Sequence, residues 1–176
     1  MEKSIFIIGY RATGKTIVGK QVAAMLNMDF LDLDKFIEQD AGMNISQIVA
    51  KDGWTSFRAM EKKALQESIL LQRPKVISCG GGAIIHKEIW PKIKQNNVII
   101  LLKASPNTIL TRLKNDTVSK TQRPRLIEEK TSLKNEITNT LQERLPLYGQ
   151  WADIEIDTDT LTPDQVAQKI IEEVIS

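Results

Sequence analysis

The strongest constraint on the fold is the glycine-rich segment from Gly9 to Thr16, which reads GYRATGKT. Gly9 and Gly14 are separated by four residues, and Lys15 and Thr16 follow directly, which is the P-loop pattern. The segment comes immediately after the apolar run Ile5–Ile8 and opens a stretch of helical period, as the motif requires. At the average glycine frequency of about 7%, a chance match in this chain has a probability under about 1%. A plain glycine turn before a helix is therefore the weaker interpretation.

In a P-loop, backbone N–H groups and the positive end of the following helix face a polyphosphate. We expect Lys15 to reach the β- and γ-phosphates of a nucleotide, and the Thr16 hydroxyl to bind Mg²⁺. The predicted nucleotide contacts within this segment are Gly9, Arg11, Ala12, Thr13, Gly14, Lys15, Thr16 and Ile17.

The composition is that of one globular domain spanning residues 1–176, with 41% apolar and 26% charged residues. A net charge of +2, without a dense stripe of Lys and Arg, does not predict a nucleic-acid partner. Cys79 is the single cysteine, which favours a reducing compartment. The apolar run near the start ends at Gly9, so neither a targeting signal nor a membrane span is expected. We therefore expect a cytoplasmic monomer.

Short apolar segments alternate along the chain with longer segments of helical period. The predicted strands are residues 4–8, 30–32, 75–79, 98–102 and 154–157, and the predicted helices are residues 15–27, 45–51, 55–71, 87–95, 106–114, 133–148 and 164–174. Strands rich in Ile, Val and Leu without strict alternation indicate burial on both faces. An α/β fold follows, with a parallel sheet between two layers of helices. Residues 115–125 are polar and aperiodic, and we expect them to form a loop long enough to act as a mobile lid.

Several classes of P-loop protein are disfavoured by motifs that the sequence lacks. Guanine-specific switches use an Asn-Lys-x-Asp motif, and this chain has no Asn-Lys pair. The Leu-Ser-Gly-Gly-Gln signature of transporter-type ATPases is also absent. A short chain with one P-loop and a lid is typical of a small-molecule kinase, which must exclude water to prevent hydrolysis of ATP.

Two carboxylates, Asp32 and Asp34, follow the predicted strand at 30–32. On an extended strand, residues two apart project to the same face, and the carboxyl end of a parallel strand borders the ligand crevice. One carboxylate would then hold Mg²⁺ through water, and the other would accept a hydrogen bond from an attacking hydroxyl group. The alternative is a solvated strand end at which Asp34 caps the next helix.

Three further segments suggest a site for a small anion. Arg58 and Glu61 share a helix face, where Arg58 would clamp a carboxylate while Glu61 orients it. Gly80–Gly82 follow a strand and would allow a close approach of backbone to ligand. Arg144 lies near an apolar helix stripe, an unusual place for a charge unless it faces a polar cleft. The alternatives are a surface ion pair for Arg58 and Glu61, a flexible turn for the three glycines, and extension to solvent for Arg144.

Taken together, these segments resemble the shikimate kinases, a small group related to the nucleoside-monophosphate kinases. The resemblance runs from Gly9 to Pro163. Its motifs are the P-loop, Asp32-Leu33-Asp34, Gly53, Phe57-Arg58, Glu61, Gly80-Gly81-Gly82, Arg123-Pro124 and Arg144-x-x-x-Tyr148-x-x-x-Ala152. The resemblance implies a five-stranded parallel sheet with the P-loop strand at its centre. It also implies transfer of the γ-phosphoryl group of MgATP to the 3-hydroxyl of shikimate.

The resemblance assigns roles to individual residues. The implied catalytic residues are Lys15, Asp34 and Arg123, and Arg123 would approach the transferred phosphoryl group with the lid. The implied contacts to the acid are Asp34, Arg58, Gly80, Gly81, Gly82 and Arg144. Thr16, Asp32 and Ser78 would serve Mg²⁺ directly or through water. Arg112 would stack on adenine, and residues 158–163 would border the base.

Some positions depart from the family pattern. They are Ala12, Thr13 and Ile17 in the P-loop, Trp54 where Glu is usual, and Arg125 where Leu is common. His86 has no neighbouring cluster in the sequence, and we expect an ordinary helix-start or surface residue. Cys79, on a buried strand, is expected to serve packing.

Two other functions are compatible with these residues. A kinase for another small polyol acid, such as gluconate, would keep the P-loop without needing Arg58 and Arg144 to converge on a ring carboxylate. A catalytically silent nucleotide-binding module is a different class, which the intact Lys15, Asp32 and Asp34 argue against.

Overall fold

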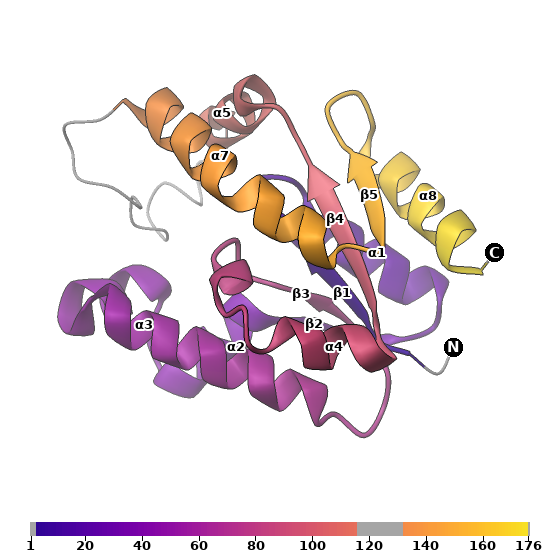
Figure 1. Cartoon of the computed structure of the whole chain (residues 1–176), viewed down its shortest axis with the longest axis horizontal. Helices are drawn as coiled ribbons and strands as arrows, with labels where there is room; N and C mark the ends of the chain where they lie inside the picture. Colours follow the sequence, from indigo (N-terminus) through magenta and orange to yellow (C-terminus); the bar gives the residue numbers. More distant parts are fainter. Residues whose placement is uncertain (1–2, 116–131, 176) are drawn as a thin grey trace.

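The computed structural model describes residues 3–115 and 132–175, and its centre is a five-stranded parallel sheet. The strands are β1 (Ile5–Ile8), β2 (Asp29–Asp32), β3 (Lys75–Ser78), β4 (Val98–Lys103) and β5 (Ile154–Asp157). Their order across the sheet is β2-β3-β1-β4-β5, so the P-loop strand β1 is central (Figure 1). This confirms the predicted α/β architecture, the strand locations and the central place of β1.

Helices cover both faces of the sheet (Figure 1). They are α1 (Lys15–Met25), α2 (Leu33–Ala41), α3 (Ile45–Ile69), α4 (Trp90–Asn96), α5 (Pro106–Asn115), α7 (Leu133–Trp151) and α8 (Pro163–Ile175), with a short 3₁₀ helix η1 (Ala83–Ile85). Alternate residues of β1 serve opposite faces: Ile5 and Ile7 pack with α1 and α8, whereas Phe6 and Ile8 pack with the layer that contains α2, α3, α4 and α7. Because both faces are covered, the strand is continuously apolar.

The structure differs from the prediction around α2, which the sequence analysis missed. Asp32 ends β2 and begins α2 as its N-cap, because its Oδ1 accepts a hydrogen bond from the Lys35 N–H at 3.3 Å. Asp34 therefore lies in the first turn of a helix, and the predicted strand-like alternation of Asp32 and Asp34 was wrong. The proposed cap at Asp34 was also wrong, since Asp32 is the capping residue.

Residue Gly53 interrupts α3. It has φ 78° and ψ 170°, so the helix bends there, and the prediction of separate segments at 45–51 and 55–71 is confirmed. The predicted start of a helix at residue 87 was wrong, since η1 precedes α4 and α4 begins at Trp90.

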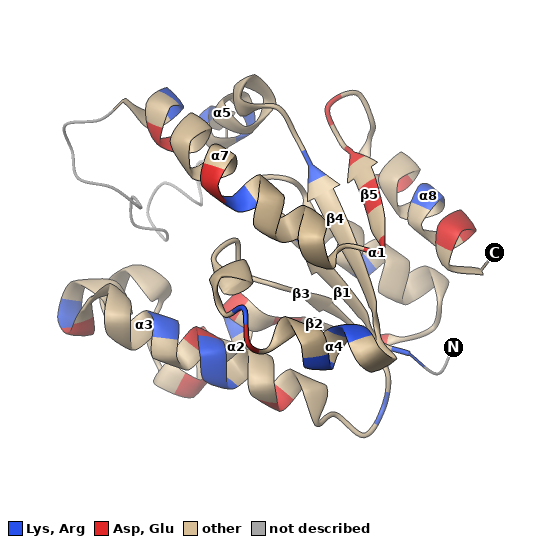
Figure 2. Ribbon diagram, in the orientation of Figure 1, with Lys and Arg blue, Asp and Glu red and all other residues tan. Residues whose placement is uncertain are grey.

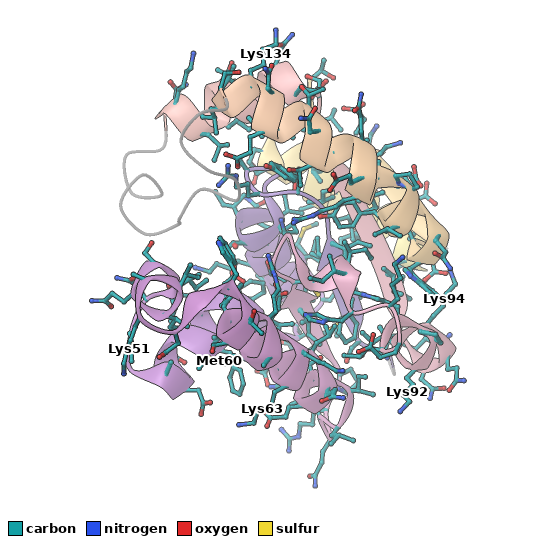
Figure 3. The ribbon with its side chains drawn as sticks, turned by 60° about the vertical axis from the view of Figure 1, so that its left-hand side comes forward. Lys51, Met60, Lys63, Lys92, Lys94 and Lys134 are labelled. Carbon is teal, nitrogen blue, oxygen red and sulfur yellow. The ribbon has the colours of Figure 1, made fainter. Side chains whose placement is uncertain are left out.

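Charged residues lie mainly on the outer helices and at strand ends (Figure 2). The lysines labelled in Figure 3 are exposed and are spread over three helices, with Lys51 and Lys63 on α3, Lys92 and Lys94 on α4, and Lys134 on α7. Within residues 3–115 and 132–175, no helix combines the length and the apolar character needed to cross a membrane.

Candidate active site

The loop between β1 and α1 has the backbone conformation of a phosphate cradle. Gly9 and Gly14 have φ of 139° and 97°, and a Cβ at Gly9 would lie 2.3 Å from the Leu102 carbonyl oxygen. Gly9 is therefore required for both conformation and space. Ala12 also has a positive φ, 62°, which is a strained conformation for a residue with a side chain. Left-handed residues within a tight loop turn backbone N–H groups toward a shared concavity that suits anions.

Lys15, at the start of α1, is buried beneath this loop. Its Nζ donates a hydrogen bond to the Tyr10 carbonyl at 2.7 Å, and the Thr13 hydroxyl donates to the same oxygen at 2.8 Å. Both contacts hold the loop closed around the ammonium group. The structure thus places a buried positive charge at the base of the predicted phosphate site.

Oxygen ligands suitable for Mg²⁺ lie at the carboxyl ends of β2 and β3. The Thr16 hydroxyl donates to Asp32 Oδ2 at 2.7 Å, and Ser78 pairs in register with Asp32 on the neighbouring strand. Among the described residues no group of three or more His, Cys, Asp or Glu side chains could enclose a metal. Mg²⁺ commonly retains waters and binds one or two carboxylates together with substrate phosphates. The three predicted ligands therefore fit this ion.

A cavity beside the P-loop lies between α1 and the segment after β5. Its lining residues are Thr13, Gly14, Ile17, Val18, Arg112, Thr158, Leu161, Pro163 and Val166. The Arg112 guanidinium donates to the Ala12 carbonyl at 3.2 Å and to the Thr158 carbonyl at 2.6 Å. Arg112 thus joins the P-loop to the 158–163 segment, and its planar group forms one wall of the space expected for a nucleotide base.

A second cleft lies on the other side of the P-loop, against α2, α3 and α7. Its lining residues are Tyr10, Arg11, Asp34, Ile45, Trp54, Phe57, Arg58, Glu61, Gly81, Gly82 and Arg144. The structure therefore brings together Asp34, Arg58 and Arg144, which come from three different helices. It also places them next to Tyr10 and Arg11 of the P-loop.

Arg58 is held on several sides. Its NH1 donates to Glu61 Oε2 at 2.5 Å, and its Cζ lies 5.2 Å from the ring centroids of both Trp54 and Phe57. Such cation–π contacts orient a guanidinium without neutralising it. Since Glu61 is only 1% exposed, the alternative of a surface ion pair was wrong.

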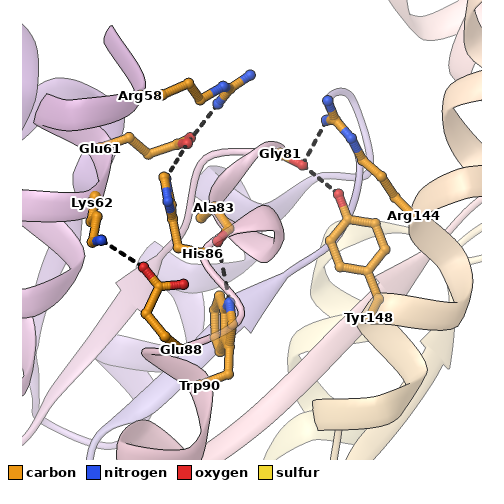
Figure 4. Close-up of polar contacts among 10 residues, drawn as sticks. All are labelled: Arg58, Glu61, Lys62, Gly81, Ala83, His86, Glu88, Trp90, Arg144 and Tyr148. Atoms are coloured by element: carbon orange, nitrogen blue, oxygen red, sulfur yellow. Dashed lines mark hydrogen bonds and ion pairs between the residues drawn. The ribbon is translucent and has the colours of Figure 1, made fainter. Parts of the chain in front are cut away.

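Arg144 and Tyr148 approach the cleft from α7. Arg144 NH1 donates to the Gly81 carbonyl at 2.9 Å, and the Tyr148 hydroxyl donates to the same oxygen (Figure 4). Burial raises the pKa of Tyr148 above its ordinary value, so the phenol remains a donor at neutral pH. The alternative of an arginine extended to solvent was wrong.

The glycine run contacts the charged side chains closely. A Cβ at Gly80 would lie 2.6 Å from Asp34 Oδ1 and 2.8 Å from Glu61 Oε1, and one at Gly82 would lie 2.0 Å from Arg58 NH1. The run is therefore a surface against which side chains of the cleft rest. Gly81 and Gly82 do lie in a turn, and the run is packed against Asp34, Glu61 and Arg58.

Three features in and beside the cleft were not expected. The Arg11 side chain, assigned to the nucleotide, lines this cleft and pairs with the buried Glu136 of α7 at 2.5 Å. Trp54, which departs from the family pattern, forms part of the wall of the cleft. His86 is 8% exposed and lies 3.1 Å from Glu61 Oε2, so the expectation of an ordinary surface residue was wrong. The contacts of His86 with Glu61 and of Arg11 with Glu136 join residues 25 and 125 positions apart, so no local sequence pattern could predict them.

Arg123 lies outside the described residues. Cys79 is buried, and burial raises the pKa of its thiol even though Lys15 nearby opposes the rise. A protonated, enclosed thiol is a packing group, as expected.

Comparisons with known proteins agree on one family. The family model described as shikimate kinase matches residues 11–175. A shikimate kinase of Thermodesulfovibrio yellowstonii is 43% identical over 97% of this chain and 94% of its own length. One from Caldanaerobacter subterraneus is 39% identical over 96% of this chain and 94% of its own length.

Solved structures give the same result. A shikimate kinase from Acinetobacter baumannii in complex with shikimate has a TM-score of 0.88 and 31% identity, covering 98% of this chain and 93% of its own. The enzyme from Aquifex aeolicus has a TM-score of 0.81 and 28% identity, covering 98% and 96%. With the P-loop, the two adjoining clefts and these relatives in agreement, the chain belongs to the shikimate kinase family.

Proposed function

We propose that this chain transfers the γ-phosphoryl group of MgATP to the 3-hydroxyl of shikimate, producing shikimate 3-phosphate and ADP. Its family consists of ATP-dependent kinases that act on an alcohol group. The observation that carries the proposal is the convergence of Arg58, Arg144 and Asp34 in one cleft beside the P-loop. Two guanidinium groups and a carboxylate match an acid that also presents hydroxyl groups. The comparisons do not support the gluconate alternative.

On the nucleotide side, the P-loop amides and Lys15 would hold the phosphates, and Arg112 with residues 158–163 would border the base. Lys15 is buried and fixed by Tyr10, so its charge is in place before the nucleotide arrives. A preorganised charge at the site where negative charge develops stabilises the transition state without reorganisation.

On the acid side, Arg58 and Arg144 would bind the carboxylate, with Gly80, Gly81 and Gly82 as the floor of the cleft. Asp34 would accept a hydrogen bond from the 3-hydroxyl and assist its deprotonation as the phosphoryl group transfers. Holding the hydroxyl in line with the γ-phosphate is the main task in this chemistry, because phosphoryl transfer depends on positioning and charge neutralisation.

Thr16, Asp32 and Ser78 are the residues that would hold Mg²⁺, directly or through water. The ion, when bound with ATP, neutralises phosphate charge during transfer. Asp32 is suited to this role because its Oδ1 is engaged as the α2 cap while Oδ2 faces Thr16.

We further propose a single kinase domain over residues 1–176, acting as a cytoplasmic monomer. Residues 34–61 would form its acid-binding segment, which is supported by the cleft residues contributed by α2 and α3. The lid at about residues 115–125 and the catalytic role of Arg123 remain predictions. Of that lid, only Asn115 lies within the described residues.

A coupled assay of ADP release, run with shikimate and with gluconate as acceptor, tests the proposed function. We expect MgATP-dependent turnover with shikimate and none with gluconate. Turnover only with gluconate would refute the proposed substrate. Binding of ATP without turnover of either acid would instead support the silent nucleotide-binding module.

A further inference from the structure

His86 is fixed at the end of η1, downstream of the glycine run. Its N–H donates to the Ala83 carbonyl at 3.2 Å, and its own carbonyl accepts from the Ile89 N–H at 3.0 Å. The Trp90 indole N–H also donates to the Ala83 carbonyl at 3.2 Å. With its backbone held on both sides, the buried imidazole ring has little freedom to move, and it points from this segment toward α3 (Figure 4).

The ring meets Glu61, the carboxylate that also holds Arg58. Glu61 Oε2 lies 3.1 Å from His86 Nε2 and 2.5 Å from Arg58 NH1 (Figure 4). A carboxylate oxygen accepts but does not donate, so His86 Nε2 carries the proton of this contact. A single buried oxygen thus receives one donor from the cleft and one from the segment that follows the glycine run.

The position of this carboxylate decides where the Arg58 guanidinium lies. Glu61 Oε1 faces Gly80, where a Cβ would be only 2.8 Å away, and Arg58 rests against Gly82. Glu61 is therefore confined by the glycine run at one oxygen and by two donors at the other. Without the histidine donor, Glu61 Oε2 would keep only the donor from Arg58, and we expect the buried carboxylate to shift and to carry the arginine with it.

We propose that His86 is a positioning residue for the acid site: it orients Glu61, and through Glu61 it holds Arg58 in the geometry that binds the substrate carboxylate. This inference rests on the proposed function, because it assigns Arg58 to the acid. His86 does not line the cleft, so it acts through its neighbour and not by touching the substrate.

A matched control tests the alternative that His86 acts only by joining α3 to the segment after η1. Lys62 and Glu88 form an ion pair at 2.7 Å that joins the same two segments, but their side chains are 43% and 56% exposed and neither lines the cleft. Lys62→Met removes this link between α3 and the chain after η1 without altering the donors on Glu61.

The experiment compares His86→Leu, His86→Asn and His86→Gln with the parent enzyme, using titration calorimetry with shikimate and with ADP, and steady-state kinetics. We expect His86→Leu to raise the Kd and KM for shikimate about 5- to 20-fold, as for the loss of a hydrogen bond to a charged group transmitted through one residue. The Kd for ADP should stay within about 2-fold and kcat within about 3-fold.

The glutamine and asparagine variants test whether the donor must lie at the position of Nε2 or whether any polar side chain is enough. Glutamine places an amide N–H near the position of Nε2 and should restore shikimate affinity to within about 3-fold, whereas the shorter asparagine should behave like leucine. If His86→Leu does not fold, the difference in shikimate affinity between His86→Gln and His86→Asn still tests the role of His86. Lys62→Met should bind shikimate like the parent.

The outcomes distinguish this inference from the function on which it rests. If Arg58→Ala binds shikimate normally, the assignment of the acid site fails. If Arg58→Ala loses affinity while all His86 variants keep it, only the role of His86 is overturned. The role of His86 would also be overturned if the Gln and Asn variants weakened shikimate binding equally, or if Lys62→Met weakened it. A general loosening of the contact between α3 and the segment after η1 would then explain the effect.

Discussion

The substitution Gly82→Ala tests how closely the glycine run positions Arg58, the arginine that we propose to bind the acid. Gly82 has φ −93° and ψ −12°, a conformation open to any residue, so alanine brings no backbone strain. The added methyl group would lie 2.0 Å from Arg58 NH1 and 2.5 Å from its Cζ. The only relief is movement of the guanidinium.

The magnitude follows from these distances. Ordinary contact begins near 3.4 Å, so the guanidinium must retreat by about 1.4 Å from its 2.0 Å approach. A shift of that size breaks the geometry of a charge-assisted hydrogen bond. Losing one such bond costs about 1.5–3 kcal/mol, which corresponds to an increase of roughly 10- to 150-fold in the Kd for shikimate.

Titration calorimetry measures the Kd for shikimate and for ADP, and thermal unfolding reports on the fold. The ADP affinity should be unchanged, since Gly82 does not border the nucleotide cavity. The Tm should change little, because the new methyl group would meet only the end of the Arg58 side chain, which is 20% exposed.

Gly149→Ala provides the control with the same chemical change. Gly149 lies in α7, and its new Cβ would meet only Glu155 Oε1 at an ordinary 3.4 Å. We expect unchanged shikimate affinity and a small gain in stability, about 0.5–1 kcal/mol. If Gly82→Ala bound shikimate within about 3-fold of the parent, the described contact of Arg58 with the glycine run would be refuted.

Three further predictions concern separate parts of the molecule. Lys15→Met should lower kcat by at least about 100-fold in the coupled assay while shikimate still binds; retained turnover would contradict its role. Arg144→Ala should weaken shikimate binding by roughly 2–5 kcal/mol in calorimetry and leave ADP binding nearly unchanged, and an equal loss of both affinities would contradict the assignment. The Ser105 N–H lowers the pKa of Asp159 below its ordinary value, so its stabilising effect is present at neutral pH and is lost as pH falls through the folded-state pKa. Asp159→Ala should therefore lower the free energy of unfolding slightly, by less than about 1 kcal/mol for so exposed a group, and in denaturant titrations this difference from the parent should disappear as the pH falls through the folded-state pKa; a difference that stays constant while the carboxyl group is protonated would argue against the charge.

The fold was largely predictable because its signals are local. The P-loop follows an apolar strand and opens a helix, and five short apolar runs mark the five strands. The short helix α2 was missed because β2 passes into it without an intervening loop, with Asp32 serving as both strand end and cap. Gly53 was a visible break, and the structure shows the bend it causes.

The sequence by itself determined most of the elements, the phosphate-binding loop and the residue types that we propose to face an acid, since each depends on neighbours within a few positions of the chain. Only the tertiary structure decided how those residues are held. Glu61 acquires a second donor from His86, Arg58 rests on Gly82, and Arg11 turns away from its loop toward a buried glutamate on α7. Such contacts join segments tens of residues apart, and they form because burial leaves each charged group dependent on whichever partner the packed helices bring within reach.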